Sequence, residues 1–408
     1  MSAPDFDVLI IGGGPAGVAA AIELRRLGVD KVGLLEREPV LGGATRHCSH
    51  SPFGMRHYQR IFIGASYGRR LQADASAAGV DIRIRHSIVS LEDRASVLVS
   101  SPEGVQTLSA RRIVTATGAR EIPRSARLIS GERPIGVLTT GALQAYVAFH
   151  GLMPFRRPVI VGSELVSMSA LLTCLAHGAR PVAMLESRSH ATVRAPYSWL
   201  PHLTGVEFHR NATVVDIWGD GRVEGISFKT GGSVRKLACD GLLLSGQFTP
   251  ESALLLQSEM GVAPGSAGPA IDQDGRLRNP LHFAAGNVLR GVETAGWAFR
   301  EGQAVGRAVA GDLLAGPLEQ VPVEVSFVAP IKLVVPTLIR KSVLSCSAFG
   351  DFQLRVSHRV RGEIQLLLDG HVVWRKHAVW MPERRILVPI PREAEQARSI
   401  AFHFKETR

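Results

Sequence analysis

The stretch DVLIIGGGPAG, residues 7–17, decides the fold of this chain. Its first five residues form a continuous, mostly apolar run, as expected of a central parallel strand, and its glycines follow the spacing G-x-G-x-x-G. A helical pattern then runs to Gly28, and a second strand over Lys31–Leu35 ends in Glu36, 19 residues after the last glycine. This βαβ unit has the order and length of a dinucleotide-binding fingerprint.

Each glycine of the fingerprint has a separate physical task. Gly12 permits the tight turn, Gly14 lets a pyrophosphate approach the backbone, and Gly17 lets helix and strand pack closely. Unpaired N–H groups at the start of the helix favour negative charge, and Glu36 accepts a hydrogen bond from a ribose hydroxyl. The sequence therefore predicts a dinucleotide site here, to which we also assign Pro15, Ala16, Arg37 and Gly43.

A second βαβ unit begins near Pro158, but its fingerprint is broken. A strand, a helix over 165–176 and another strand follow one another as in the first unit, yet the turn at 162–167 reads GSELVS. Glu164 places a side chain and a negative charge where an anionic pyrophosphate has to approach the backbone. We therefore predict a degenerate domain of the NAD(P) type. Glu186 still stands where a ribose acid would, so nicotinamide binding stays open.

The pattern of apolar and polar residues changes after Pro322. Helical periodicity gives way to short alternating runs, and Asp369-Gly370 between two of them is a strong type I′ hairpin signal. The pattern predicts a small β-sandwich over residues 322–408.

Two further segments indicate which dinucleotide is bound. Ala116-Thr117-Gly118 and Gly286-Asn287 each follow a short apolar strand. With the fingerprint, these residues resemble the two-dinucleotide-binding-domain flavoproteins related to glutathione reductase. The resemblance implies that the N-terminal fingerprint holds FAD and that the Ala-Thr-Gly segment passes beneath it. It also implies that Gly286-Asn287, with Asn in place of the family's Asp, contacts the ribityl and phosphate groups.

A narrower resemblance lies in residues 48–54 and 136–144. The first segment is similar to a Cys-x-His-x-x-Phe-Gly stretch in relatives of the A subunit of anaerobic glycerol-3-phosphate dehydrogenase. The second is similar to a segment shared, more distantly, by opine oxidase A subunits, hydrogen cyanide synthase B subunits and dye-linked proline dehydrogenases. These proteins oxidise different molecules, so the resemblance implies substrates that range from glycerol 3-phosphate-like compounds to amino and imino acids.

The predicted fold class is α/β in three domains. We expect an FAD-binding Rossmann-like domain made of residues 1–123 and 246–321. A second Rossmann-like domain, residues 124–245, is inserted between these parts. The β-sandwich of residues 322–408 completes the chain.

The segment after the Gly42-Gly43 pair supplies the catalytic candidates. Relatives of glutathione reductase carry their redox cysteines there, but Cys48 has no partner in the segment, so dithiol–disulfide chemistry is excluded. A single cysteine can still form a sulfenic acid, or simply pack beside the flavin. His50, and after it His47, is a candidate base for removing a proton while hydride leaves the substrate. A hydrogen-bonded structural histidine is the alternative for each.

Two other groups are candidates for substrate contact. Arg290 and Glu293 follow the Gly286-Asn287 turn and can reach a carboxylate or an amine, unless they form a solvated helix start. The tryptophans at 297, 374 and 380 are candidate substrate walls, or else core or interface anchors.

The expected function is that of an FAD-dependent oxidoreductase. Because the second fingerprint is broken, we expect a dehydrogenase or oxidase that takes hydride from a CH–OH or CH–NH substrate. An NAD(P)H-dependent flavin reductase and a non-catalytic FAD-binding subunit of a heteromeric dehydrogenase are the alternatives. The expected partners are a small-molecule substrate, a redox partner subunit, and further copies or chains that contact the C-terminal domain in an oligomer.

Composition limits the remaining possibilities. The 408 residues carry 47 Lys and Arg against 36 Asp and Glu, a net charge of +11, but this excess is scattered, so we expect no nucleic acid. The 4 cysteines form no Cys-x-x-Cys motif, and no metal site is predicted. Solitary cysteines, an N-terminus without a basic signal region and the lack of a long apolar span predict a cytoplasmic protein.

Overall fold

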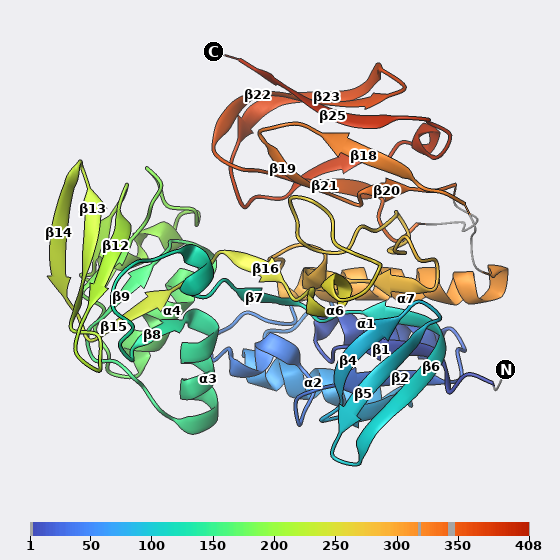
Figure 1. Ribbon diagram of the computed structural model, residues 1–408, viewed down its shortest axis with the longest axis horizontal. Helices are drawn as coiled ribbons and strands as arrows, with labels where there is room; N and C mark the ends of the chain where they lie inside the picture. Colours follow the sequence, from blue (N-terminus) through green and yellow to red (C-terminus); the bar gives the residue numbers. More distant parts are fainter. Residues whose placement is uncertain (1–2, 317–319, 342–346, 408) are drawn as a thin grey trace.

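The computed structural model describes residues 3–316, 320–341 and 347–407, which form three lobes (Figure 1). The first lobe is built on a sheet of order β3-β2-β1-β6, with β17 beside β6, and these five strands are parallel. The long strand β6 continues into an antiparallel extension with β5 and β4. The strands are β1 (Phe6–Ile11), β2 (Val32–Glu36), β3 (Asp81–Ile84), β4 (Ser87–Glu92), β5 (Ser96–Ser101), β6 (Gly104–Thr115) and β17 (His282–Ala284).

Helices α1 (Pro15–Arg26) and α7 (Ala295–Ala315) pack against each other beside this sheet, with α2 (Gly64–Ala77) nearby (Figure 1). Two glycines of α7 make the close approach possible. A Cβ on Gly302 would overlap the carbonyl oxygen of Ala16, and one on Gly306 would lie 3.0 Å from that of Ala20. The glycines therefore fix α7 directly against the helix that follows the fingerprint. The short helix α6 (Ala253–Leu256) belongs to the same part of the chain.

The second lobe carries a parallel sheet of order β11-β10-β9-β15-β8 and a separate antiparallel sheet β12-β13-β14. Two antiparallel strands, β7 and β16, connect it to the first lobe (Figure 1). Its helices are α3 (Thr140–His150), α4 (Leu165–Ala176) and α5 (Leu200–Leu203). The strands are β7 (Ala119–Glu121), β8 (Val137–Thr139), β9 (Pro158–Val161), β10 (Ala183–Leu185), β11 (Glu207–His209), β12 (Thr213–Trp218), β13 (Gly225–Thr230), β14 (Ser233–Ala238), β15 (Gly241–Leu244) and β16 (Phe248–Pro250).

The third lobe is a sandwich of a sheet β20-β18-β25-β22-β23 and a sheet β19-β21-β24. Asp369 and Gly370, at φ 48° and 82°, join β22 to β23, which confirms the predicted hairpin. The strands are β18 (Val323–Phe327), β19 (Ile331–Val335), β20 (Leu338–Ile339), β21 (Asp351–Val356), β22 (Val360–Leu368), β23 (His371–Trp380), β24 (Ile386–Pro389) and β25 (Ile400–Glu406).

A buried ionic network ties the third lobe to the first. Asp312 of α7 pairs with Arg112 of β6 and, at 2.7 Å, with Arg276; Asp272 pairs with Arg340, which follows β20, at 2.8 Å. All five side chains are buried. Removing one member of such a network leaves an uncompensated buried charge, so the network fixes how the sandwich sits on the first lobe.

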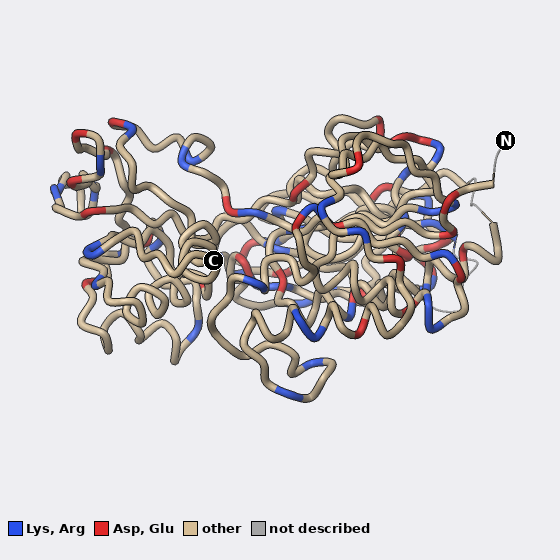
Figure 2. The backbone as a smooth tube through the Cα atoms, turned by 90° about the horizontal axis from the view of Figure 1, so that it is seen from below, with Lys and Arg blue, Asp and Glu red and all other residues tan. Residues whose placement is uncertain are grey.

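The α/β fold class with two Rossmann-like sheets and a C-terminal sandwich is confirmed. The domain limits at 123, 245 and 321 remain predictions. Lys and Arg are interspersed with Asp and Glu along the chain (Figure 2). In the described residues, no helix combines the length and the apolar character needed to cross a membrane.

Candidate functional site

The first glycine-rich turn is open at one position only. Gly12 has φ 107°, and a Cβ there would lie 2.5 Å from the carbonyl oxygen of Ala116. A Cβ on Gly17 would overlap the carbonyl oxygen of Gly12. A Cβ on Gly14, which is the N-cap of α1, would meet nothing within 4 Å, and this N-cap has no side-chain capping bond. The empty space therefore lies where helix N–H groups can receive an anionic group.

Glu36 lies buried at the end of β2, next to this turn. Its Oε2 accepts a hydrogen bond from the Gly13 N–H at 2.7 Å, and its Oε1 accepts one from the Glu38 N–H at 2.9 Å. Each carboxylate oxygen has two lone pairs, so both can accept a further hydroxyl donor. Arg37 is exposed beside it. A Cβ on Gly43 would lie 3.0 Å from the Gly14 Cα, so the segment after β2 returns to the same turn.

The other two predicted segments also reach this place. Gly118, at φ 79°, has open space around it, and Thr117 next to it donates a hydrogen bond from Oγ1 to the Glu251 carbonyl at 2.8 Å. A Cβ on Gly286 would lie 2.6 Å from the Ala16 Cβ. The structure thus gathers segments from residues 12–17, 43, 116–118 and 286 around the start of α1.

Asn287 is engaged inside its own turn. Its Nδ2 donates to the Glu293 carbonyl at 3.1 Å, and its Oδ1 accepts from the Glu293 N–H at 2.8 Å. The side chain therefore shapes the loop over 287–293, and its contact with a cofactor remains a prediction. Arg290 is buried and pairs with Glu301 at 2.8 Å, so the alternative that it is a solvated residue is wrong.

The third lobe braces this loop, which sequence reasoning missed. Arg355 of β21 donates from Nη2 to the Val292 carbonyl at 2.9 Å and to Glu293 Oε1 at 2.9 Å, and from Nη1 to the Gly291 carbonyl. Three polar residues at alternate positions of strand 351–356 were the available signal, since Asp351, Gln353 and Arg355 face the same side of β21.

Cys48 is a poor nucleophile in this setting. Burial raises the pKa of its thiol to about 12. Its Sγ lies 3.4 Å from the Ala44 carbonyl oxygen and 3.8 Å from Gln144 Oε1, so the single S–H can donate to either acceptor. Thiolate, the reactive form, is therefore scarce at neutral pH. The packing alternative for Cys48 fits these contacts.

The histidines of the segment differ in their surroundings. Burial, with the Arg46 charge as a smaller cause, lowers the pKa of His47 to about 4. Burial also lowers the pKa of His50, whose Nδ1 lies 3.4 Å from the Ser51 carbonyl oxygen. His57 stacks on Phe299 at 3.9 Å between ring centroids, and both its nitrogens are buried without hydrogen-bond partners. His57 is thus a neutral packing group, whereas His50 retains a ring nitrogen with no hydrogen-bond partner in the described structure.

The second turn has the backbone of the first but is filled. Gly162 keeps φ 117°, yet the Glu164 carboxylate lies over it and over Gly246; Oε2 would be 2.7 Å and 2.5 Å from a Cβ at these two positions. Burial, and then the charge of Glu186, raises the pKa of Glu164. Ser163 Oγ donates to Glu186, whose other oxygen accepts from the Arg188 N–H at 2.9 Å. Side chains of this chain thus fill the second turn, whereas the first turn is open at Gly14.

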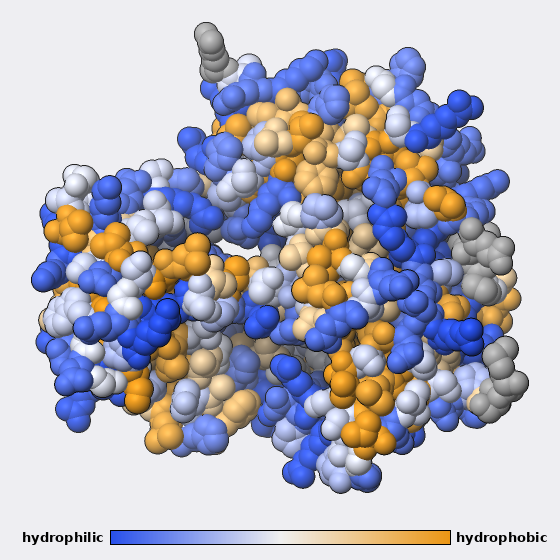
Figure 3. Space-filling model, viewed as in Figure 1, coloured by the Kyte–Doolittle hydropathy of each residue, from blue (hydrophilic) through white to orange (hydrophobic). Residues whose placement is uncertain are grey.

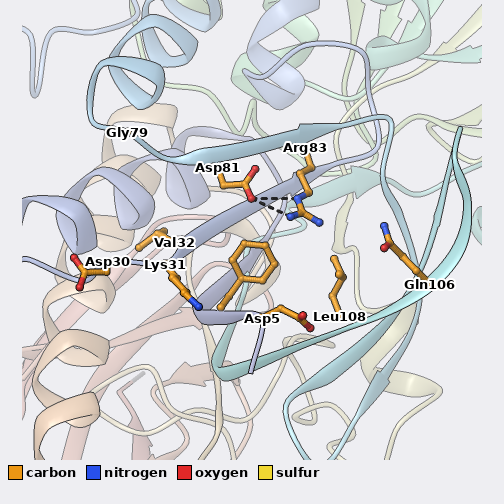
Figure 4. Close-up of a pocket in the computed structure, with 10 residues that line it drawn as sticks. Asp5, Asp30, Lys31, Val32, Gly79, Asp81, Arg83, Gln106 and Leu108 are labelled. Carbon is orange, nitrogen blue, oxygen red and sulfur yellow. Dashed lines mark hydrogen bonds and ion pairs between the residues drawn. The ribbon is translucent and has the colours of Figure 1, made fainter. Parts of the chain in front are cut away.

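A separate hollow of about 480 Å³ lies elsewhere on the first lobe (Figure 4). Phe6, Val32 and Asp81 line it, and these residues begin β1, β2 and β3. The fingerprint lies at the opposite, carboxyl ends of the same strands, which is where parallel α/β sheets bind ligands. The hollow is therefore not the dinucleotide site. In the described residues, no group of three or more His, Cys, Asp or Glu is placed to hold a metal ion.

An open glycine-rich turn, a filled second turn and a buried glutamate at the end of the next strand in each unit define a protein with two Rossmann-like domains. The family described as pyridine nucleotide-disulphide oxidoreductase matches residues 6–302, and the chain belongs to this family of FAD-dependent oxidoreductases. FAD is its cofactor, and the open Gly14 position and the buried Glu36 fit such a ligand.

Curated relatives include the A subunit of opine oxidase from Agrobacterium tumefaciens, 26% identical over 315 residues that cover 69% of this chain and 61% of the relative. Hydrogen cyanide synthase subunit HcnB of Pseudomonas aeruginosa is 26% identical over 247 residues, which cover 53% and 49% of the two chains. The chain thus spans less than two thirds of the length of these relatives. The predicted likeness to both proteins is confirmed.

Solved structures share the fold over about three quarters of this chain. Thioredoxin reductase of T. acidophilum matches with a TM-score of 0.62 at 21% identity, covering 76% of this chain and 100% of that chain. L-proline dehydrogenase of P. horikoshii matches with a TM-score of 0.55 at 18% identity, covering 77% and 56%.

Proposed function

We propose that this protein is a dehydrogenase or oxidase that oxidises a CH–OH or CH–NH bond of a small molecule. FAD, when bound, supplies the hydride acceptor. The observation that carries the proposal is the Glu164 carboxylate, which lies across Gly162 in the second turn. A carboxylate in this place excludes the pyrophosphate of NAD(P)H by volume and by charge. The organic substrate is then the electron donor.

The residues that would hold FAD come from four segments. The first turn of α1 would receive the pyrophosphate beside Gly14, and Glu36 would accept from a ribose hydroxyl. The backbone at 116–118 and at Gly286 would line the remainder. Pro15, Ala16, Gly43 and Asn287 shape these walls in the proposal.

His50 is the proposed base. Its Nδ1 faces the Ser51 carbonyl at 3.4 Å, which favours the tautomer with the proton on Nδ1 and a free lone pair on Nε2. The lowered pKa keeps the ring neutral at neutral pH, as a proton acceptor must be. Nε2 would take the proton of the substrate O–H or N–H while the neighbouring C–H bond is broken.

The relatives suggest the setting in which the protein works. The opine oxidase relative and HcnB are both named as subunits, which supports a partner subunit for this chain. We further propose the relationship to the A subunit of glycerol-3-phosphate dehydrogenase that residues 48–54 suggest, and a reducing, cytoplasmic location, which rests on the solitary cysteines. Contacts through the sandwich would join the copies or subunits.

The test is anaerobic bleaching of the visible flavin absorbance of the purified yellow protein. The donor panel holds 2-hydroxy acids, amino acids, imino acids and glycerol 3-phosphate, with NADH and NADPH included. Bleaching by an organic donor, with little by the nicotinamides, is expected. The second candidate function is a flavin reductase, which the buried Glu186 after β10 favours. Rapid bleaching by NADH or NADPH alone would establish that function instead.

A further inference from the structure

Three arginine side chains surround one aromatic ring near the start of α7. The guanidinium carbons of Arg56, Arg300 and Arg385 lie 4.6, 5.7 and 3.9 Å from the ring centroid of Trp297. These arginines come from the segment after the Gly-Gly pair, from α7 and from the loop between β23 and β24. A cation–π contact uses none of the guanidinium N–H groups as hydrogen-bond donors to a carboxylate, so these groups can also bind an anion.

These guanidinium groups have few anionic partners. In the part of the chain that the structure describes, Arg56 makes no side-chain hydrogen bond, and Arg300 donates from its side chain only to the Arg56 carbonyl, at 2.9 Å. Arg385 lies 3.8 Å from Glu293, a carboxylate that Arg355 already binds at 2.9 Å. The Arg385 side chain is only 16% exposed. A largely buried cation without a hydrogen-bonded acceptor is costly, so an anionic ligand would stabilise it.

The sequence neighbour of Arg385 adds a further positive charge to the same loop. Arg384, next to Arg385, has its pKa lowered by burial and then by the charge of Arg194. Arg194 follows β10 in the second lobe, so like charges approach each other across the space between the second and third lobes. Figure 3 shows a hollow between these lobes. An anion there would relieve the repulsion.

The ring lies beside the segment that carries the proposed base. Trp297 follows the loop closed by Asn287 and Glu293, and a Cβ on the neighbouring Gly296 would lie 2.9 Å from Arg56 Cδ. Arg56 belongs to the same segment as His50. A ligand held by its acidic group at Trp297 would therefore contact Arg56, which lies six residues after the proposed base.

We propose that Arg56, Arg300 and Arg385, arranged around Trp297, bind the carboxylate or phosphate group of an anionic small-molecule substrate. The site is independent of the proposed function, but the statement that its ligand is the substrate rests on it. Carboxylate and phosphate share the bidentate chemistry that guanidinium groups recognise, so the two sources have to be separated by experiment.

The test measures anion binding directly. The FAD-loaded oxidised protein is titrated with succinate and, separately, with inorganic phosphate at low ionic strength, by calorimetry. We expect one anion per chain and at least about tenfold weaker binding in Arg385→Gln and in Arg56→Gln. Arg375→Gln, an exposed arginine of β23, serves as the matched control and should bind like the unmodified protein. A preference for succinate identifies a carboxylate ligand, and a preference for phosphate identifies a phosphate ligand.

Two results would overturn the site: no anion binding at millimolar concentration, or equal binding by all variants with their FAD retained. Arg385→Lys keeps the positive charge but loses the bidentate geometry of the guanidinium group, so it should bind the anion more tightly than Arg385→Gln and more weakly than the unmodified protein. The donor panel separates this proposal from the proposed function. If a donor bleaches the flavin with the same KM in Arg385→Gln as in the unmodified protein, the proposed dehydrogenase or oxidase function stands and the proposed anion site is rejected. If the protein binds the anion but no organic donor of the panel bleaches the flavin, the proposed function is rejected and the anion site stands.

Discussion

The two glycine-rich turns of this molecule share a backbone and differ in what fills them. Gly12 and Gly162 begin the turns at φ 107° and 117°, and each unit ends in a buried glutamate that accepts a backbone N–H. The third position differs: space around Gly14 is empty, whereas the Glu164 carboxylate folds over its own turn. One side chain can therefore fill a glycine-rich turn while the backbone of that turn is kept.

The largest effect is expected where the open turn is filled. Gly14→Glu should abolish retention of FAD, to below about a tenth of the normal content, because the new side chain takes the pyrophosphate position and repels it. The fold should survive, since a Cβ at Gly14 meets nothing within 4 Å. Flavin absorbance and circular dichroism of the purified variant measure both. Gly350→Glu, another open glycine with unstrained φ, is the control and should stay yellow.

If the second turn cannot bind NAD(P)H, electrons enter the flavin from a substrate beside the segment that carries Cys48 and His50. His50→Asn should lower the rate of flavin bleaching by about 10²-fold with FAD still bound. The base acts when neutral, so the rate rises with pH through its pKa. Because that pKa is lowered from 6.5, the inflection should lie below 6.5 and vanish in the variant. Stopped-flow measurements across pH record this. Cys48→Ser should be mild; an inactive Cys48→Ser beside a normal His50→Asn would reject the base and revive sulfenic-acid chemistry.

Removing the side chains that fill the second turn should allow it to bind a dinucleotide, as the first turn is proposed to do. Glu164→Gly with Ser167→Gly removes the carboxylate and the hydroxyl that contacts it at 3.2 Å. We expect at least about tenfold tighter binding of NADH, since one repulsive charge and its volume are removed. Glu164→Gln separates the two causes, because it keeps the volume and removes the charge. Fluorescence titration with NADH measures the change, and tight binding by the unmodified protein would show that the turn was never closed.

The smallest effect concerns the support that Arg355 of the sandwich gives to the loop beside the first site. Arg355→Gln should weaken FAD retention by about tenfold or less, because the loop at 291–293 loses its charged hydrogen bonds from the sandwich. Arg355→Lys should recover part of it. Dissociation of FAD during dilution gives the value. Arg361→Gln, exposed on β22, should behave normally, and an equal loss in this control would assign the effect to the sandwich as a whole.

The sequence predicted the elements whose chemistry is local. The helix expected at 165–176 is α4, residue for residue, and the strand before each glycine turn is present. Periodicity and glycine spacing carry these features because they depend on neighbours along the chain. The connecting strands β7 and β16 and the antiparallel sheet β12-β13-β14 were not predicted, since short, half-exposed strands have weak patterns.

Parts of the site that join distant segments were harder to predict. The contact of Arg385 with Trp297 links residues that only the docking of the sandwich brings together. The filling of the second turn was foreseen from Glu164, but its position over Gly246 depends on a strand that comes much later in the chain. Charge and composition indicate that such residues exist, and only tertiary packing decides which of them meet.

The late arrival of β17 has a consequence for how the chain is made. The parallel sheet of the first lobe is complete only when β17 pairs with β6, where His282 lies opposite Ile113. During synthesis, about 170 residues separate these two positions. The second lobe, continuous between β7 and β16, can fold during that interval, while the edge of β6 and the face of α1 that receives α7 stay uncovered. In nascent chains halted before residue 282, the second lobe should thus resist proteases, whereas the N-terminal part of the first lobe should be cleaved. Chaperones would bind the apolar surfaces that these chains leave exposed.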